Sequence, residues 1–223
     1  MKLLVVIPYR DREDHLYRLI PHITNILDNQ KINYKIVVVE QNQGKLFNRG
    51  LLCNIGFHIY NYDYEYVIFH DVDMICSNID YTYSDCPTSL LRYRSKHDYR
   101  QIHDHYFGGV TLFPNKDFII INGFSNEYWG WGAEDDDLRI RCSILNLSIK
   151  NRLGKCLDLE IESTTNKIQK NKNYQNNLNK LNNFIKTKNI DIIKHDGLSN
   201  VNELYHIKNT ISNQLFSIVK VEV

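Results

Sequence analysis

The segment Trp129–Asp137 combines two tryptophans, two glycines and four consecutive carboxylates, which run from Glu134 to Asp137. A tryptophan beside a carboxylate offers an apolar platform next to a hydrogen-bonding base, an arrangement that suits a sugar ring. Carboxylates also favour the first turn of a helix, which accounts for part of the cluster. It does not account for the two tryptophans, which are the whole complement of the chain. We therefore interpret this segment as a candidate site for sugar binding and catalysis.

A second acidic pair, Asp71 and Asp73, directly follows the apolar run 66–70. Two carboxylates at a strand end can hold a hard divalent cation, which prefers oxygen ligands. Such a cation would neutralise the charge that develops on a diphosphate leaving group. The same spacing occurs in ordinary strand-end turns, so the position after a buried strand is what favours a metal site.

Two further motifs place aromatic rings beside arginines: Pro8-Tyr9-Arg10-Asp11-Arg12 and Phe47-Asn48-Arg49. Guanidinium groups bind phosphate through paired donors, and Tyr9 could stack on a base. A surface helix start and ordinary helix amphipathicity explain the same residues without a ligand, and the two motifs alone leave this open. A third motif, Tyr106-Phe107-Gly108-Gly109-Val110, has paired glycines inside a strand-like run, which indicates either a bulge or close approach of backbone or ligand.

The segments that must position these groups alternate between strand-like and helix-like patterns. Three apolar runs are typical of strands buried on both faces: 2–7, 34–40 and 66–70. The segments between them have apolar residues at helical spacing: 11–28, with Asp11 as the expected N-cap, and 46–60. This order predicts parallel strands joined by right-handed crossovers. Ligands of such sheets bind beyond the carboxyl ends of the strands, where 8–12, 41–44 and 71–73 fall.

The rest of the chain has weaker patterns. We expect strands at 107–113 and 156–163, helices at 114–121 and 138–147, and two edge strands within 203–221. Residues 164–190 are rich in Asn and Lys, and we expect a mobile or surface segment with a short helix marked by Leu178, Leu181 and Ile185. We expect a single domain over 1–223, with a nucleotide-binding half (1–85), a donor and acceptor half (86–163), a candidate mobile lid (164–195) and a C-terminal edge (196–223).

Composition narrows the class of protein. A net charge of +1 gives no global field that would attract nucleic acid or an anionic membrane. No apolar run approaches the roughly 20 residues needed to span a bilayer. The five cysteines lack CxxC spacing, which argues against a zinc knuckle, and their odd number and scatter favour reduced thiols. We therefore expect a soluble cytoplasmic protein rather than one of the Golgi lumen. Pairing of Cys76 with Cys86 is the alternative for a secreted chain.

Taken together, the motifs resemble those of the β-1,4-galactosyltransferase family, whose members are inverting enzymes. The resemblance extends from about Leu3 to Cys156 and includes, besides the motifs above, Asn122-Gly123-Phe124 and Tyr128–Asp137. It implies an α/β protein with the GT-A (Rossmann-like) nucleotide-sugar-binding fold, in which helices flank a mostly parallel central sheet.

The resemblance also implies a role for each matching residue. The uridine diphosphate would be held by Pro8, Tyr9, Arg10, Arg12, Phe47 and Arg49, with Asp71 and Val72 at the nucleoside and Lys96 at the diphosphate. Asp73 would bind manganese. Tyr106 would shape the donor-sugar pocket for galactose, and Trp131 would cover both sugars. Asp135 would be the general base, and Glu134 and Asp136 would hold sugar hydroxyls.

The chemistry of the residues agrees with this resemblance. Attack of an acceptor hydroxyl on the anomeric carbon requires one carboxylate to take the proton, while cations stabilise the diphosphate. We therefore expect galactose transfer from UDP-galactose, with inversion, to a hydroxyl of a glycan or glycoconjugate. The alternatives are another UDP-sugar, such as UDP-GalNAc or UDP-glucose, and a degenerate carbohydrate-binding relative without turnover.

The sequence departs from the family pattern after Gly154-Lys155-Cys156. The family has Met and His as metal ligands there, whereas Asp158 and Ile161 stand at these positions. Replacement ligands could come from Asp158, Glu160, Glu162 or His195, or metal binding could be weak or absent. His97 and His103 replace the aromatic residues usual in the acceptor pocket, so the acceptor is left open.

Overall fold

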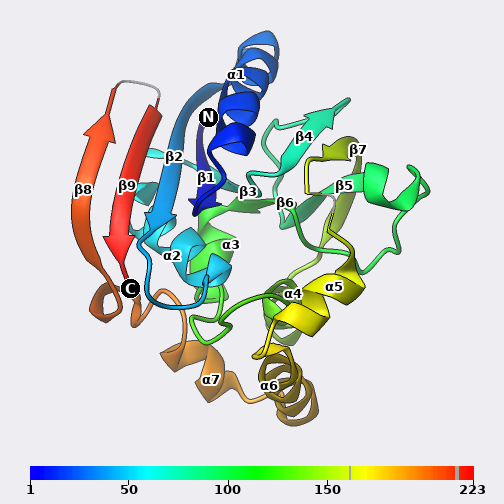
Figure 1. Cartoon of the computed structure of the whole chain (residues 1–223), viewed down its shortest axis with the longest axis vertical. Coiled ribbons are helices and arrows are strands. Elements are labelled where there is room, and N and C mark those ends of the chain that lie inside the picture. Colours follow the sequence, from blue (N-terminus) through cyan, green and yellow to red (C-terminus); the bar gives the residue numbers. More distant parts are fainter. Residues whose placement is uncertain (161, 214–215) are drawn as a thin grey trace.

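A nine-stranded mixed sheet dominates the computed structural model, which describes residues 1–160, 162–213 and 216–223 (Figure 1). In chain order the strands are β1 (Lys2–Tyr9), β2 (Asn33–Gln41), β3 (Tyr66–His70), β4 (Met74–Ser77), β5 (Thr88–Arg94), β6 (Val110–Pro114), β7 (Lys150–Asp158), β8 (His206–Ser212) and β9 (Phe216–Glu222). Their order across the sheet is β4-β7-β5-β6-β3-β1-β2-β9-β8.

The first three strands form the parallel centre that the sequence predicts. β1 pairs in parallel with both β2 and β3, through α1 (Glu13–Asn29) and α2 (Arg49–Tyr60) as crossovers. β9 adds a further parallel strand beside β2. Beyond β3 the pairing is antiparallel except for β5 with β7, so the α/β class is confirmed but the sheet is mixed.

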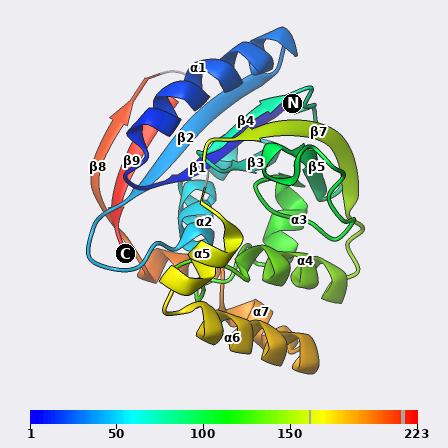
Figure 2. The ribbon, with the colours of Figure 1, turned by 45° about the vertical axis from the view of Figure 1, so that its right-hand side comes forward.

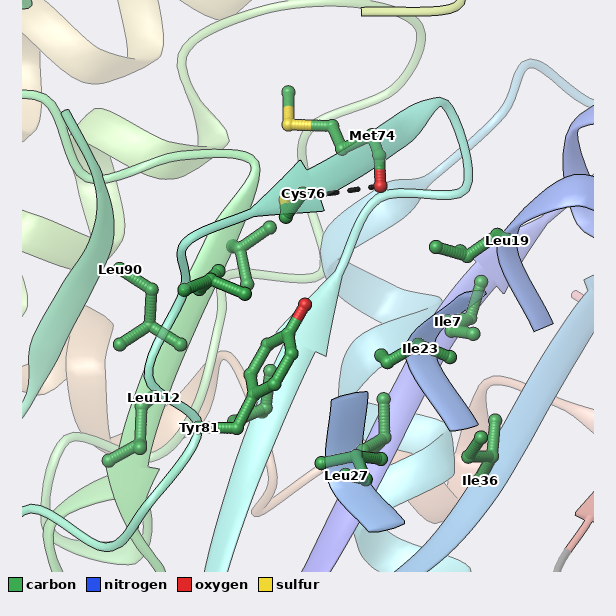
Figure 3. Close-up of a cluster of buried hydrophobic side chains, with 14 of the residues drawn as sticks. Ile7, Leu19, Ile23, Leu27, Ile36, Met74, Cys76, Tyr81, Leu90 and Leu112 are labelled. Carbon is green, nitrogen blue, oxygen red and sulfur yellow. Dashed lines mark hydrogen bonds between the residues drawn. The ribbon is translucent and has the colours of Figure 1, made fainter. Parts of the chain in front are cut away.

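Successive residues of β1 face opposite sides of the sheet and so enter two different cores. Leu3, Val5 and Ile7 lie in the core that α1 covers with Leu19, Ile23 and Leu27 (Figure 3). Leu4 and Val6 lie in the second core, which α2 shares with α3 (Asn115–Ile120) and α4 (Glu134–Ile144). Burial on both faces explains why the strand is apolar at every position from Leu3 to Ile7.

The segment expected to be a mobile or surface lid is mostly helical. It forms α5 (Thr164–Lys170), α6 (Tyr174–Thr187) and α7 (Ile190–His195), which lie with α4 at one end of the molecule (Figures 1 and 2). Helix α6 buries Asn177, Leu181 and Phe184, while Ile185 of the predicted apolar stripe is exposed. The chain also has 3-10 turns η1 (Asn61–Asp63), η2 (Ser95–His97) and η3 (Val201–Glu203).

Several predicted boundaries were wrong. Strand β7 covers Lys150–Asp158 rather than 156–163, and Ile161 lies outside the described residues. Helix α4 begins at Glu134 rather than at 138. Helix α1 begins after Arg12, and Asp11 is not its cap but a residue with φ of 52°. Of the two C-terminal strands, β8 lies at the edge while β9 is flanked on both sides.

The cysteines also differ from expectation. Cys76 and Cys156 form a disulfide across a directly paired position of β4 and β7 (Cα–Cα 4.0 Å), so Cys76 does not pair with Cys86. Cys53, Cys86 and Cys142 are free thiols. The expectation of uniformly reduced cysteines was therefore wrong for one pair.

The predicted division of the domain into four parts, with boundaries after residues 85, 163 and 195, stays a prediction.

None of the helices within the described ranges combines the length and apolarity that crossing a bilayer requires.

Candidate active site

One cleft of about 500 Å³ gathers side chains from segments that are far apart in the sequence. Most of the predicted residues line it: Pro8, Arg10, Arg12, Phe47, Arg49, Asp71, Val72, Asp73, Lys96, Tyr106, Trp131, Glu134 and Asp135. The cleft lies beyond the carboxyl ends of β1 and β3, as expected for ligand sites of parallel strands. Two predicted residues are not among the described residues that line it. Tyr9 packs against the core on the α1 side, and Asp136 is exposed.

Arg49 ties the two acidic motifs to each other. Its Nε donates to Asp71 Oδ1 at 2.6 Å and its Nη1 to Asp135 Oδ1 at 2.9 Å. Arg49 begins α2, Asp71 follows β3 and Asp135 lies in the first turn of α4, so three elements meet at one guanidinium. Within the described residues Arg49 Nη2 is buried without a hydrogen-bond partner. The cluster after the tryptophans and the aspartates after β3 therefore face the same cleft.

Gly108 allows the Asp135 carboxylate to reach this position. A Cβ at Gly108 would lie 2.3 Å from Asp135 Oδ2, far inside van der Waals contact. The neighbouring Gly109 has φ of +74° and lies against the Met74 side chain. Gly108 thus allows close approach of a side chain from α4, and Gly109 that of a side chain from β4; close approach is one of the alternatives that the sequence left open.

The acidic cluster divides between the cleft and the core. Glu134 and Asp135 line the cleft, whereas Asp137 is buried and receives hydrogen bonds from Arg141 Nε (2.6 Å) and the Tyr128 hydroxyl (3.0 Å). Helical rotation of about 100° per residue places Asp137 on nearly the opposite side from Asp135. One of the four carboxylates is therefore structural.

Burial gives the Asp135 carboxylate the properties of a base. Burial raises the pKa of Asp135 well above its usual range, the Arg49 guanidinium opposes this, and the charges of Glu134 and Asp71 add to the rise. Burial likewise raises the pKa of Glu134, with Arg49 opposing. A carboxylate with a raised pKa accepts a proton more readily than an isolated aspartate does.

The part of the cleft next to the end of β1 is basic and aromatic. Arg10 lies 5.4 Å above the Phe47 ring and donates from Nη1 to the Lys45 carbonyl at 2.8 Å. Arg12 forms an ion pair with Glu160 at 2.6 Å. These contacts hold the two predicted arginines in the segment that follows β1, where both line the cleft.

Trp131 stands at the entrance of the cleft, where it is 36% exposed. Its ring stacks on Tyr174 of α6 with centroids 5.8 Å apart, and its carbonyl accepts a hydrogen bond from Asn171 Nδ2 at 2.6 Å. The segment after α5 therefore holds the tryptophan that the resemblance assigns to sugar binding.

The carboxylates considered as replacement metal ligands are already engaged. Asp158 accepts from Arg94 Nε (2.9 Å) and Nη2, and also from Ser95 Oγ and the Lys96 amide. These bonds outweigh burial and lower the pKa of Asp158. Glu160 pairs with Arg12; although burial raises its pKa, the Glu162 amide and Arg12 bring it to about 2.

The two remaining candidates also fail to complete a metal site. Glu162 pairs with Lys170, and His195 is exposed on α7, outside the lining of the cleft. Across the described residues no group of three or more His, Cys, Asp or Glu side chains could hold a metal ion. Asp73 alone does not supply the oxygen-rich set that manganese prefers, so the side chains present do not fit a manganese site.

Other residues line the cleft that the sequence did not single out: Asp11, Met74, Arg94, Gly130, Thr164 and Lys167. His97, noted only as a departure in the acceptor pocket, lines it as well. The sequence gave no sign of Arg94, because its partner Asp158 lies 64 residues away on another strand. Lys167 lies in a segment without a family pattern.

Comparison with known proteins is consistent with this geometry. The N-terminal region of glycosyl transferase group 7 matches residues 1–87, and the N-terminal domain of galactosyltransferase matches residues 88–166. Human β-1,4-galactosyltransferase 4 is 40% identical over 157 residues, which are 68% of this chain and 45% of the human protein. The chain belongs to the β-1,4-galactosyltransferase family. Bovine β-1,4-galactosyltransferase 1 is 36% identical over 162 residues, which are 70% of this chain and 40% of the bovine one. The chain thus spans less than half the length of these curated relatives.

Solved structures of the family share the fold. The catalytic domain of Drosophila β-1,4-galactosyltransferase 7 in complex with xylobiose superposes with a TM-score of 0.78 at 24% identity, covering 100% of this chain and 94% of that one. A mutant of the same enzyme in complex with manganese, UDP-Gal and xylobiose has a TM-score of 0.77 at 25% identity, with the same coverage. The family membership and the GT-A fold predicted from the motifs are confirmed.

Proposed function

We propose that this protein is an inverting glycosyltransferase that transfers galactose from UDP-galactose to a hydroxyl of a glycan or glycoconjugate. The observation that carries the proposal is the Arg49 bridge, which places Asp135 and Asp71 in one cleft. Support for the donor comes from the Drosophila relative, whose complex holds UDP-Gal and xylobiose. We do not extend the manganese of that complex to this protein, because the described side chains of the cleft do not form a manganese site.

In this reaction Asp135 acts as the general base. The acceptor oxygen forms a bond to the anomeric carbon while its proton passes to the Asp135 carboxylate. The bond from the anomeric carbon to the phosphate oxygen breaks on the opposite face, and its electron pair leaves with UDP. A single displacement inverts the anomeric centre, so one catalytic carboxylate suffices.

The test is an Asp135→Asn variant assayed for galactose transfer from UDP-galactose. General-base catalysis contributes about 10²–10⁴-fold, so we expect transfer to fall by about that factor while UDP affinity, measured by calorimetry, stays within about threefold. An acceptor panel that includes xylose-terminated sugars, run in parallel with UDP-GalNAc and UDP-glucose, identifies the substrates.

Two outcomes would contradict the proposal. Transfer that persists in the Asp135→Asn variant would remove Asp135 as the base. Binding of UDP-sugars without turnover of any of them, with every acceptor, would favour the degenerate carbohydrate-binding alternative.

A further inference from the structure

Three basic side chains line the cleft together with Asp73 and come from three different elements. Arg94 ends β5, Lys96 lies in η2 and Lys167 lies in α5. All three side chains line the same cleft of about 500 Å³ as Asp73, so their charges face one space.

The Arg94 guanidinium is held in a fixed position. It donates from Nε (2.9 Å) and Nη2 to Asp158, and from Nη1 to the Tyr106 hydroxyl at 2.7 Å. A guanidinium has five N–H donors, and these bonds use three of them. The two that remain belong to a partly buried, oriented cation on the wall of the cleft, and such a group binds phosphate oxygens with little loss of side-chain entropy.

The two lysines, by contrast, have ammonium groups without a direct partner. Within the described parts of the chain, neither the Lys96 nor the Lys167 ammonium forms an ion pair or a hydrogen bond with another residue. Burial lowers the pKa of Lys96, as do the charges of Lys167 and Arg94, while the more distant charges of Asp158 and Asp73 oppose this. Three cations that repel one another within a cleft are stabilised when an anion enters between them.

We infer that Arg94, Lys96 and Lys167 form a cationic subsite that binds the diphosphate of the nucleotide sugar and stabilises the leaving group without a divalent metal. This inference rests on the proposed function, because it assigns the diphosphate end of the same cleft. As the bond to the anomeric carbon breaks, its electron pair moves to the phosphate oxygen, and the three cations neutralise that charge. Asp158 then serves as the anchor of Arg94 rather than as a metal ligand.

The experiment measures UDP binding by calorimetry in excess EDTA and again in saturating MnCl₂. We expect the two dissociation constants to agree within about twofold. In EDTA, the Lys167→Met variant should bind UDP about tenfold or more weakly, as expected for loss of a charge-assisted bond to phosphate. Lys170→Met is the matched control, because Lys170 lies on the same helix but pairs with Glu162, and it should bind UDP like the unmodified chain.

Arg94→Lys provides a second variant that keeps the positive charge. It should also weaken UDP binding in EDTA, because an ammonium cannot hold Asp158, Tyr106 and a phosphate in the fork geometry of a guanidinium. Thermal unfolding of each variant, compared with Lys170→Met, shows that the fold is retained.

Two results would overturn the inference. One is UDP binding that weakens about tenfold or more on chelation of metal and recovers with manganese. The other is equal UDP affinity of the Lys167→Met and Lys170→Met variants. Metal-free UDP binding that depends on Lys167, but without transfer of any sugar, would uphold this subsite and contradict the proposed transferase activity instead.

Discussion

At the scale of single residues, the proposed chemistry depends on the surroundings that raise the pKa of one carboxylate, that of Asp135. Asp135 is flanked by two other acids, Glu134 and Asp71, and only one guanidinium, that of Arg49, opposes them at close range. Burial and the neighbouring charges together favour the protonated form of Asp135 more than bulk water does. This balance has a measurable consequence for the dependence of turnover on pH.

We expect the rate of galactose transfer to fall with decreasing pH along an acid limb that lies well above the ordinary aspartate pKa of about 3.9. The sign follows from the role of the group, because a base must be ionised and burial raises the pKa of Asp135. This acid limb reports the joint titration of Asp135 and Glu134, because two interacting carboxylates do not titrate independently.

A matched variant checks this assignment. Glu134→Gln removes a neighbouring negative charge, so the acid limb should move to lower pH. Initial rates of UDP release across the pH range, with UDP affinity measured at each pH, test both statements. An acid limb near pH 4 in the unmodified chain, or no shift in the variant, would contradict them.

Gly108 gives a second prediction at this scale. Alanine there would place a Cβ against Asp135 Oδ2, so the carboxylate must move from its position. A displacement of about 1 Å can reduce turnover by about 100-fold, and we expect a loss of that order in kcat for Gly108→Ala. UDP binding should be nearly unchanged, because the diphosphate contacts come from other segments. Equal loss of binding and turnover would mean that the whole cleft had collapsed.

At the scale of elements, the pairing of β4 with β7 connects the acidic motif after β3 to the anchor of Arg94. Asp73 directly precedes β4, and Asp158 ends β7. The Cys76–Cys156 disulfide joins these two strands across a sequence separation of 80 residues.

We expect replacement of Cys76 by Ser to lower the free energy of unfolding by about 2–5 kcal/mol, as for other disulfides that close long loops. Denaturant unfolding with and without a reducing agent is the measurement. The reductant should destabilise the unmodified chain and leave the variant unchanged. Cys86→Ser is the control, because Cys86 is a free thiol and its replacement should not alter the response to reductant.

Helices and strands were predicted correctly where the hydrophobic pattern was compatible with a single type of element. The runs at 2–7, 34–40 and 66–70 are largely apolar because both faces of β1, β2 and β3 are buried, and a buried strand fits such short runs best. The strand at 156–163 was misplaced, because β7 ends at Asp158 and only the first three residues of that run belong to it.

Site prediction was limited by contacts that the local pattern does not encode. Asp71 and Asp135 could be found because their motifs are dense in charge and adjoin clear elements. Arg94 and Lys167 could not, since their positions in the cleft depend on how β5 and α5 are placed in the folded chain. Asp137 looked like part of the site because a charge count does not show which side of a helix faces the core.

At the scale of the whole molecule, the cleft exists only in the folded chain, because its walls come from segments between Pro8 and Lys167. A ligand that binds these walls must therefore stabilise the fold as a whole. UDP at about 100 times its dissociation constant should add about 2.7 kcal/mol to the free energy of unfolding.

For a chain of this size we expect such stabilisation to raise the melting temperature by about 5–10 °C. Differential scanning calorimetry with UDP, and with uridine as the control that lacks the diphosphate, measures the effect. Uridine at the same concentration should give a smaller rise. Equal rises for the two compounds would show that the diphosphate contributes nothing to binding.

The far edge of the sheet has a consequence for the behaviour of the protein in concentrated solution. Every residue of β8 is exposed, including Ile207 and Ile211, so its outer backbone groups could recruit a strand from another molecule. However, Lys208 lies between them at a break in register with β9, and there it pairs with Glu222. A charged side chain at an irregular point of an outer strand opposes sheet-to-sheet polymerisation. We therefore expect this lysine to oppose fibrous aggregation at the β8 edge, which β2 and β9 separate from the central strands that border the cleft.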